Sequence, residues 1–185
     1  FEGGFHGMGD WALMSMAPRR PGNFPQAAPD SAGIPKSLTG EMIIAPFNDA
    51  EAAASLIAQH ADELAGVIVE PCQRLLPPKP GFLERLREET RSRSIPLIFD
   101  EIVTGFRFAW GGAQEYYGVV PDLCTLGKVV GGGFPLAALA GRNEIMRHFD
   151  RLFHLSRGVR EDVSVRAGGR AVQVAGMREE VGRAP

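Results

Sequence analysis

The sequence predicts an α/β fold in which helices flank a mostly parallel sheet. Two short runs, 67–69 and 96–99, are continuously apolar and rich in β-branched or aromatic side chains, which is typical of strands covered on both faces. Residues 81–93 lie between them and show the apolar spacing of an amphipathic helix. The order strand, helix, strand implies a right-handed crossover and parallel pairing of the two strands.

The region before the first strand divides into a loop and a helix. Residues 11–48 hold six of the 14 prolines, so we expect mainly loop there, with a short extended piece at 42–45. The asparagine and aspartate at 48–49 can each cap a helix over 49–65, which Gly66 ends. This helix carries apolar residues every three to four positions, as a helix packed on one face requires.

The region after the second strand supplies two further elements. A short helix is expected at 112–117 and a third strand at 121–126. Open parallel sheets bind their ligands at the carboxyl ends of the strands. The polar residues expected at that edge are Glu70, Asp100, Glu101 and Lys128.

Composition excludes several classes of partner. A formal net charge of −2 gives no clustered positive charge for nucleic acid or anionic lipid, so neither is expected as a partner. No stretch approaches the roughly 20 apolar residues of a membrane span. Cys72 and Cys124 are too few for a disulfide framework and are expected to be buried thiols in a reducing, cytoplasmic setting. No metal site is expected.

Asp100 and Lys128 are the two residues most suited to chemistry. Each lies at or shortly after the end of an apolar run, so neighbouring strands could deliver both to one cleft. A carboxylate at the end of a buried strand needs a cation or several donors to stay ionised. Lysine suits Schiff-base chemistry because burial readily lowers its pKa, and the glycines at 131–133 let backbone approach a bound group. Taken singly, each feature is more often a surface lysine, a flexible loop or a helix cap.

A rival interpretation is an ATPase with its acidic strand at Asp100-Glu101. In P-loop enzymes such a pair binds magnesium and orients the attacking water. That interpretation requires the phosphate loop G-x-x-x-x-G-K-[ST], and here Asp122 stands in place of its first glycine and Val129 follows Lys128. The ATPase therefore remains a remote alternative.

A set of motifs resembles the class III aminotransferases, which depend on pyridoxal 5'-phosphate. Order and spacing agree throughout, and within the family the likeness is greatest to glutamate-1-semialdehyde 2,1-aminomutase and its relatives. The motifs are Phe5-His6-Gly7, Val69-Glu70-Pro71, Ile98 to Arg107, Pro121-Asp122-Leu123, Thr125 to Lys128 and Gly131 to Pro135.

The resemblance implies roles for residues around the cofactor. Lys128 would form the Schiff base with pyridoxal phosphate and move protons during amino-group transfer, and Asp100 would keep the pyridine nitrogen protonated. Phe5 matches the aromatic residue that stacks on the ring, and His6 beside it would orient the loop. Val103 stands where many aminotransferases of the family carry Gln and the aminomutases carry Met, so it leans toward the aminomutases.

The resemblance also implies the substrate side and the assembly. Glu70 matches the glutamate of the family's Glu-Pro motif near the substrate, although a structural salt bridge explains it equally well. The substrate would be an amino acid or amino aldehyde, and the parent enzyme a homodimer. Epimerisation or decarboxylation on the same scaffold stays open, because the substrate-reading residues lie largely outside the chain.

The chain is expected to be a fragment. Residues 1–150 would be a partial cofactor-binding large domain, because the chain opens at Phe1 inside a motif and the family's phosphate loop would lie upstream. Residues 151–185 do not match the family and hold seven arginines, as a shifted reading frame or a divergent tail would give. The second hypothesis is therefore a catalytically inactive fragment of such an enzyme.

Overall fold

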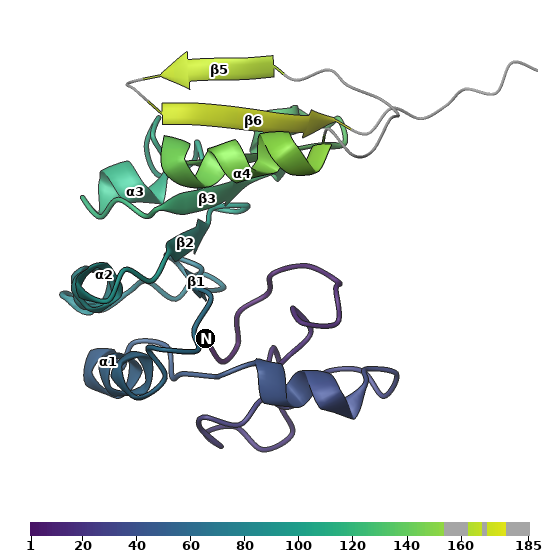
Figure 1. Ribbon diagram of the computed structural model, residues 1–185, viewed down its shortest axis with the longest axis vertical. Coiled ribbons are helices and arrows are strands. Elements are labelled where there is room, and N and C mark those ends of the chain that lie inside the picture. Colours follow the sequence, from purple (N-terminus) through teal and green to yellow (C-terminus); the bar gives the residue numbers. More distant parts are fainter. Residues whose placement is uncertain (154–162, 168–169, 177–185) are drawn as a thin grey trace, which may run out of the picture.

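The computed structural model describes residues 1–153, 163–167 and 170–176. They form a six-stranded sheet in the order β1-β2-β3-β4-β6-β5 (Figure 1). The first three strands pair in parallel and the others antiparallel, so the expected parallel sheet is confirmed for β1 to β3 and continues as a mixed sheet. The strands are β1 Val67–Val69, β2 Leu97–Asp100, β3 Leu123–Leu126, β4 Leu136–Gly141, β5 Val163–Ala167 and β6 Arg170–Gly176.

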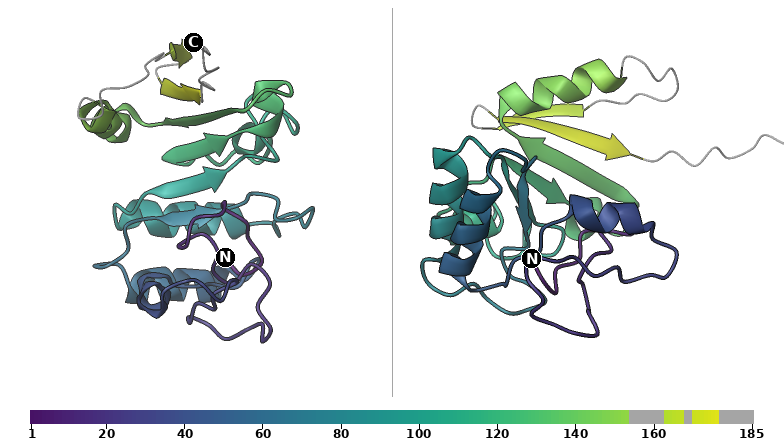
Figure 2. Two further views of the ribbon diagram at one scale, coloured as in Figure 1. Left: turned by 90° about the vertical axis from the view of Figure 1, so that its right-hand side faces the viewer. Right: turned by 60° about the horizontal axis from the view of Figure 1, so that its bottom comes forward.

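Two helices cover one side of the first strands. Helices α1 (Ala50–Gln59) and α2 (Phe82–Ser92) lie side by side against β1 and β2, and the loop-rich first 48 residues lie on the opposite side (Figures 1 and 2). The core between helices and sheet contains fully buried Phe82, Leu86 and Phe99. The apolar stripe of α2 and the two apolar strands thus pack as the sequence predicts.

Helix α1 begins as expected but ends early. Asp49 accepts a hydrogen bond from Ala52 N at 3.0 Å, which is the predicted N-terminal cap. The helix ends at Gln59 rather than near residue 65, and turns follow. Leu64 still packs on the core, from a turn, so its apolar character indicated burial without requiring helix.

Other elements were not expected from the sequence. Strand β4 consists mainly of alanine and leucine and lacks the β-branched residues that mark β1. The hairpin β5–β6 falls within 151–185, where the sequence shows no amphipathic stripe, and it pairs with β4. The expected short helix and third strand are confirmed as α3 Ala113–Tyr116 and β3, and the remaining helices are η1 Lys36–Glu41, η2 Lys128–Gly131 and α4 Asn143–Phe153.

Strand pairing fixes which polar residues meet. In the parallel register of β2 and β3, Asp100 lies opposite Thr125, and Lys128 follows three residues later at the same edge. Cys72 and Cys124 are both buried, which confirms the expected buried thiols. Among the described helices, none has the length and apolar character needed to cross a bilayer.

Candidate active site

Asp100 ends β2 as a buried carboxylate with three donors. Its side chain is 7% exposed. Oδ1 accepts hydrogen bonds from Thr125 Oγ1 and from Ile102 N, both at 3.2 Å, and Oδ2 lies 2.7 Å from His6 Nδ1. Together these three contacts hold the carboxylate in one orientation. None of the three is the arginine or lysine that commonly neutralises a buried carboxylate.

The loop that brings His6 to Asp100 depends on a glycine turn. Gly3 has φ +87°, a conformation that L side chains rarely adopt. The turn is held by backbone bonds from Gly3 N to Ser15 O at 2.8 Å and from Gly4 N to Phe1 O at 3.0 Å. Residues 94 positions apart in sequence therefore meet at the sheet edge.

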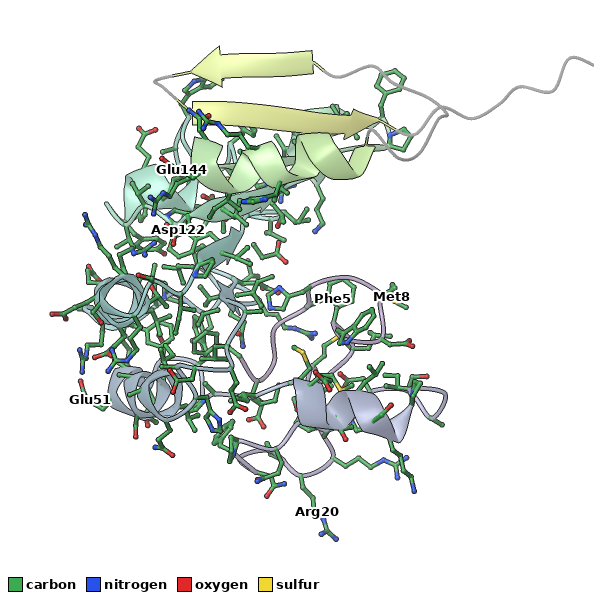
Figure 3. All side chains as sticks on the ribbon, viewed as in Figure 1. Phe5, Met8, Arg20, Glu51, Asp122 and Glu144 are labelled. Carbon is green, nitrogen blue, oxygen red and sulfur yellow. The ribbon has the colours of Figure 1, made fainter. Side chains whose placement is uncertain are left out.

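Phe5 and Glu70 meet in the same way. Phe5 N donates to Glu70 Oε1 at 2.7 Å, and Arg74 N lies 3.4 Å from Glu70 Oε2. Glu70 thus binds backbone amides, and the structure gives it no ion pair among the described residues. The ring of Phe5 remains 40% exposed, so it is no ordinary core phenylalanine. Figure 3 shows it beside Met8, on the loop-rich side of the sheet.

Lys128 stands at the start of η2, directly after β3. Its side chain is exposed and its φ is +49°, which is left-handed backbone for a residue other than glycine. Gly132 and Gly133 also have positive φ, so the chain turns tightly after the lysine. Strained backbone of this kind is concentrated at functional sites. The exposed amine and the carboxylate of Asp100 share the carboxyl edge of β2 and β3.

Glu101 lies next to Asp100, but its carboxylate oxygens already accept hydrogen bonds from the loop and helix that follow. It is 1% exposed. It accepts hydrogen bonds from Ala113 N at 2.5 Å, from Thr104 Oγ1 at 3.1 Å and from Gln114 Nε2 at 3.1 Å. A carboxylate engaged in this way holds the start of α3 and is not placed to orient a water molecule. The ATPase alternative therefore loses its second acidic residue.

The structure brings together some predicted site residues and leaves others apart. His6 with Asp100 and Phe5 with Glu70 form bonded pairs. Val103 is 38% exposed, and its backbone O accepts a hydrogen bond from Arg107 Nη1 at 2.9 Å.

Sequence reasoning missed Thr125 and Gln73 as neighbours of the site. The register of two parallel strands could have placed Thr125 opposite Asp100. Gln73 lies in a loop after β1, and no local pattern marks it.

Comparisons with known proteins agree with this geometry. The class-III aminotransferase family model matches residues 1–156. Glutamate-1-semialdehyde 2,1-aminomutase from Methanocaldococcus jannaschii is 48% identical over 155 residues, covering 82% of this chain and 36% of that protein.

Solved structures give the same result. An omega-transaminase from Sphaerobacter thermophilus superposes with a TM-score of 0.76 at 43% identity, over 82% of this chain and 36% of its own. A transaminase with PLP bound gives a TM-score of 0.70 at 30% identity, over 78% and 34%. The chain therefore spans about a third of the length of the relatives it matches. With its motifs, its sheet and its matched residues in agreement, the chain belongs to the class-III aminotransferase family.

Proposed function

We propose that the protein of which this chain forms a part transfers an amino group with pyridoxal 5'-phosphate, as an aminotransferase or as an aminomutase of the glutamate-1-semialdehyde type. The observation that carries the proposal is the pairing of two unlike groups at one sheet edge. Among the described residues, the buried carboxylate of Asp100 has no cationic side-chain partner other than His6, and Lys128 is an exposed amine three residues beyond the strand position opposite Asp100.

The residues present fit the cofactor's chemistry. Pyridoxal phosphate supplies an aldehyde that condenses with amines and a ring that accepts electrons when its nitrogen is protonated. Asp100 is suited to hold that proton, since a carboxylate beside a pyridinium stabilises its charge. Lys128 is suited to bind the aldehyde, and its amine takes part in no ion pair among the described residues.

The residues of this chain would divide the work after the substrate arrives. The free amine of Lys128 would act first as a general base, taking a proton from the substrate carbon. It would then act as a general acid and give that proton to another atom of the reacting group. His6 would keep Asp100 oriented through the bond from Nδ1, and Phe5 would cover one face of the ring. Glu70, whose carboxylate binds Phe5 N, would fix the position of that aromatic side chain.

Substrate, assembly and location belong to the same proposal. The two kinds of relative suggest a small amino acid or amino aldehyde as substrate. We further propose a homodimeric, cytoplasmic parent enzyme. Val103 lies exposed near the Asp100 edge, and we expect it to contact the cofactor ring beside the ring hydroxyl.

The test is reductive labelling of the chain. The purified chain is incubated with pyridoxal phosphate and reduced with borohydride, and the modified peptide is identified by mass spectrometry. We expect one adduct on Lys128, absent from Lys128→Ala and much reduced in Asp100→Ala. Equal labelling of Lys36, Lys79 and Lys128 would contradict a formed site in this chain and would favour the inactive fragment.

A further inference from the structure

Gln73 is a buried amide at the turn that carries His6. The residue is 7% exposed, and its Nε2 donates to Glu2 O at 2.7 Å. A β-carbon added to Gly3 would lie 2.7 Å from Nε2, so the amide packs directly on the glycine turn. Gln73 thus holds the segment that carries Phe5 and His6. It does so through a bond to Glu2, which lies 71 positions earlier in the sequence.

Two buried polar atoms near this turn have no hydrogen-bond partner within the part of the chain that the structure describes. They are Gln73 Oε1 and His6 Nε2. A β-carbon added to Gly4 would lie 2.9 Å from His6 Nε2 and 3.6 Å from Gln73 Oε1. The two atoms are therefore no further apart than the sum of those distances, and both border the space beside Gly4. Buried polar groups are nearly always hydrogen-bonded, so this pair needs an explanation.

One water molecule can link the two atoms. A carboxylate only accepts hydrogen bonds, so His6 Nδ1, 2.7 Å from Asp100 Oδ2, carries a proton and donates it. In that tautomer His6 Nε2 is an acceptor, as is the Gln73 carbonyl oxygen, so a water molecule that donates to both would satisfy them together. This bridge restricts rotation of the imidazole ring and so keeps Nδ1 directed at Asp100.

We propose that Gln73 is a positioning residue for His6 and, through His6, for the Asp100 carboxylate. Its Nε2 holds the glycine turn, and its Oε1 holds the outer nitrogen of the imidazole through one water molecule that donates to both. Gly4 is required because a side chain there would separate the two atoms. The link to catalysis rests on the proposed function, whereas the link to His6 does not.

The experiment uses the chain without cofactor, labelled with ¹⁵N-histidine. The Nδ1 proton of His6 should give a resolved NMR signal that exchanges slowly with water, assigned by its loss in His6→Gln. In Gln73→Met, which keeps length but removes both polar atoms, we expect exchange to become about 10-fold faster, the effect of one hydrogen bond. Gln73→Glu keeps an acceptor and should retain most of the protection.

Two controls separate this role from general support of the fold. Gln59→Met makes the same change at an exposed position on α1 and should leave the His6 signal unchanged. Gly4→Ala keeps Gln73 but fills the space between the two atoms, so it should also speed exchange, and it serves if Gln73→Met does not fold. An unchanged His6 signal in a folded Gln73→Met or Gly4→Ala variant would overturn the proposal. Labelling of Lys128 by pyridoxal phosphate is measured separately and tests the proposed function.

Discussion

Strands β2 and β3 have a buried aspartate at each end of the pair, and the two aspartates have different neighbours. Asp100 at the carboxyl edge is 7% exposed and Asp122, just before β3, is 5% exposed, so burial does not distinguish them. Asp122 binds Arg87 at 2.7 Å, Arg142 at 3.1 Å and Leu97 N at 2.9 Å. Phe5 directly precedes His6, the partner of Asp100. In Figure 3, Phe5 and Asp122 lie on opposite sides of β2.

The difference lies in the donors. Two arginines neutralise Asp122 and leave it no charge to offer a ligand, so it fastens α2 and the β4–α4 corner to the sheet. Asp100 is held by a histidine, a threonine and a backbone amide, and its charge remains available to a cationic ligand. A buried acid is therefore a candidate site residue when its partners orient it without cancelling its charge.

The largest expected effect separates the two aspartates by stability. Asp122→Ala leaves the half-buried Arg87 without its counter-ion, and we expect it to lower the free energy of unfolding by about 3 kcal/mol. Asp100→Ala removes an acceptor only and should lower it by about 1 kcal/mol. Urea unfolding followed by circular dichroism measures both. Equal losses would mean that the two carboxylates play the same structural role.

Glu101 should behave like Asp122 rather than like its neighbour Asp100. Glu101→Gln turns an acceptor of several hydrogen bonds into a group whose amide faces other donors, such as Ala113 N. We expect a loss of about 2 kcal/mol in the free energy of unfolding. Labelling of Lys128 by pyridoxal phosphate should persist in the folded fraction. If the variant kept full stability and lost labelling, Glu101 would belong to the site instead.

Acid should remove the stabilisation that the Asp122 carboxylate gives to the fold. Burial raises the pKa of Asp122, but the hydrogen bonds from Leu97 N, Arg87 and Arg142 outweigh it and hold the pKa below the ordinary value of 3.8. A lowered folded-state pKa stabilises the fold above the unfolded-state value, and this contribution is lost as pH falls through the folded-state value. Asp122→Asn should therefore flatten the decline in stability below about pH 4. A parallel decline in both proteins would contradict the assignment.

The smallest effect should come from the outer arginine of the Asp122 cluster. Arg142 is 58% exposed, whereas Arg87 is 18% exposed. Solvent screens an exposed ion pair, so Arg142→Met should move the urea midpoint less than Arg87→Met does. The matched substitutions, measured side by side, show how much each arginine contributes. A larger effect at Arg142 would mean that its link between Asp122 and the start of α4 dominates.

Local patterns in the sequence predicted the parts of the fold that depend on local chemistry. The apolar runs of β1 and β2, the stripe of α2 and the Asp49 cap all appear where expected. Strand β4 was missed because its alanines and leucines suit helix equally well, and its strand form comes from pairing with β3. The spacing of apolar residues within β4 does not show that the segment pairs with β3.

The site divides in the same way. Asp100 and Lys128 were predicted because they follow strands, and the shared edge is confirmed by the β2–β3 register. The bond from His6 to Asp100 spans 94 residues, and Gln73 meets Glu2 across 71. Contacts between distant loops depend on the three-dimensional path of the chain, so no residue pattern near Gln73 could have predicted these contacts.

The left-handed backbone of Lys128 has a consequence for evolution under heat. At φ +49° a lysine is less favourable than glycine by about 1 kcal/mol. Selection for thermal stability alone would therefore favour Gly or Asn at this position, while the proposed amino transfer requires Lys. If that function holds, a library of this protein screened only for heat resistance should enrich inactive sequences at residue 128, so such a screen needs an activity step at every round.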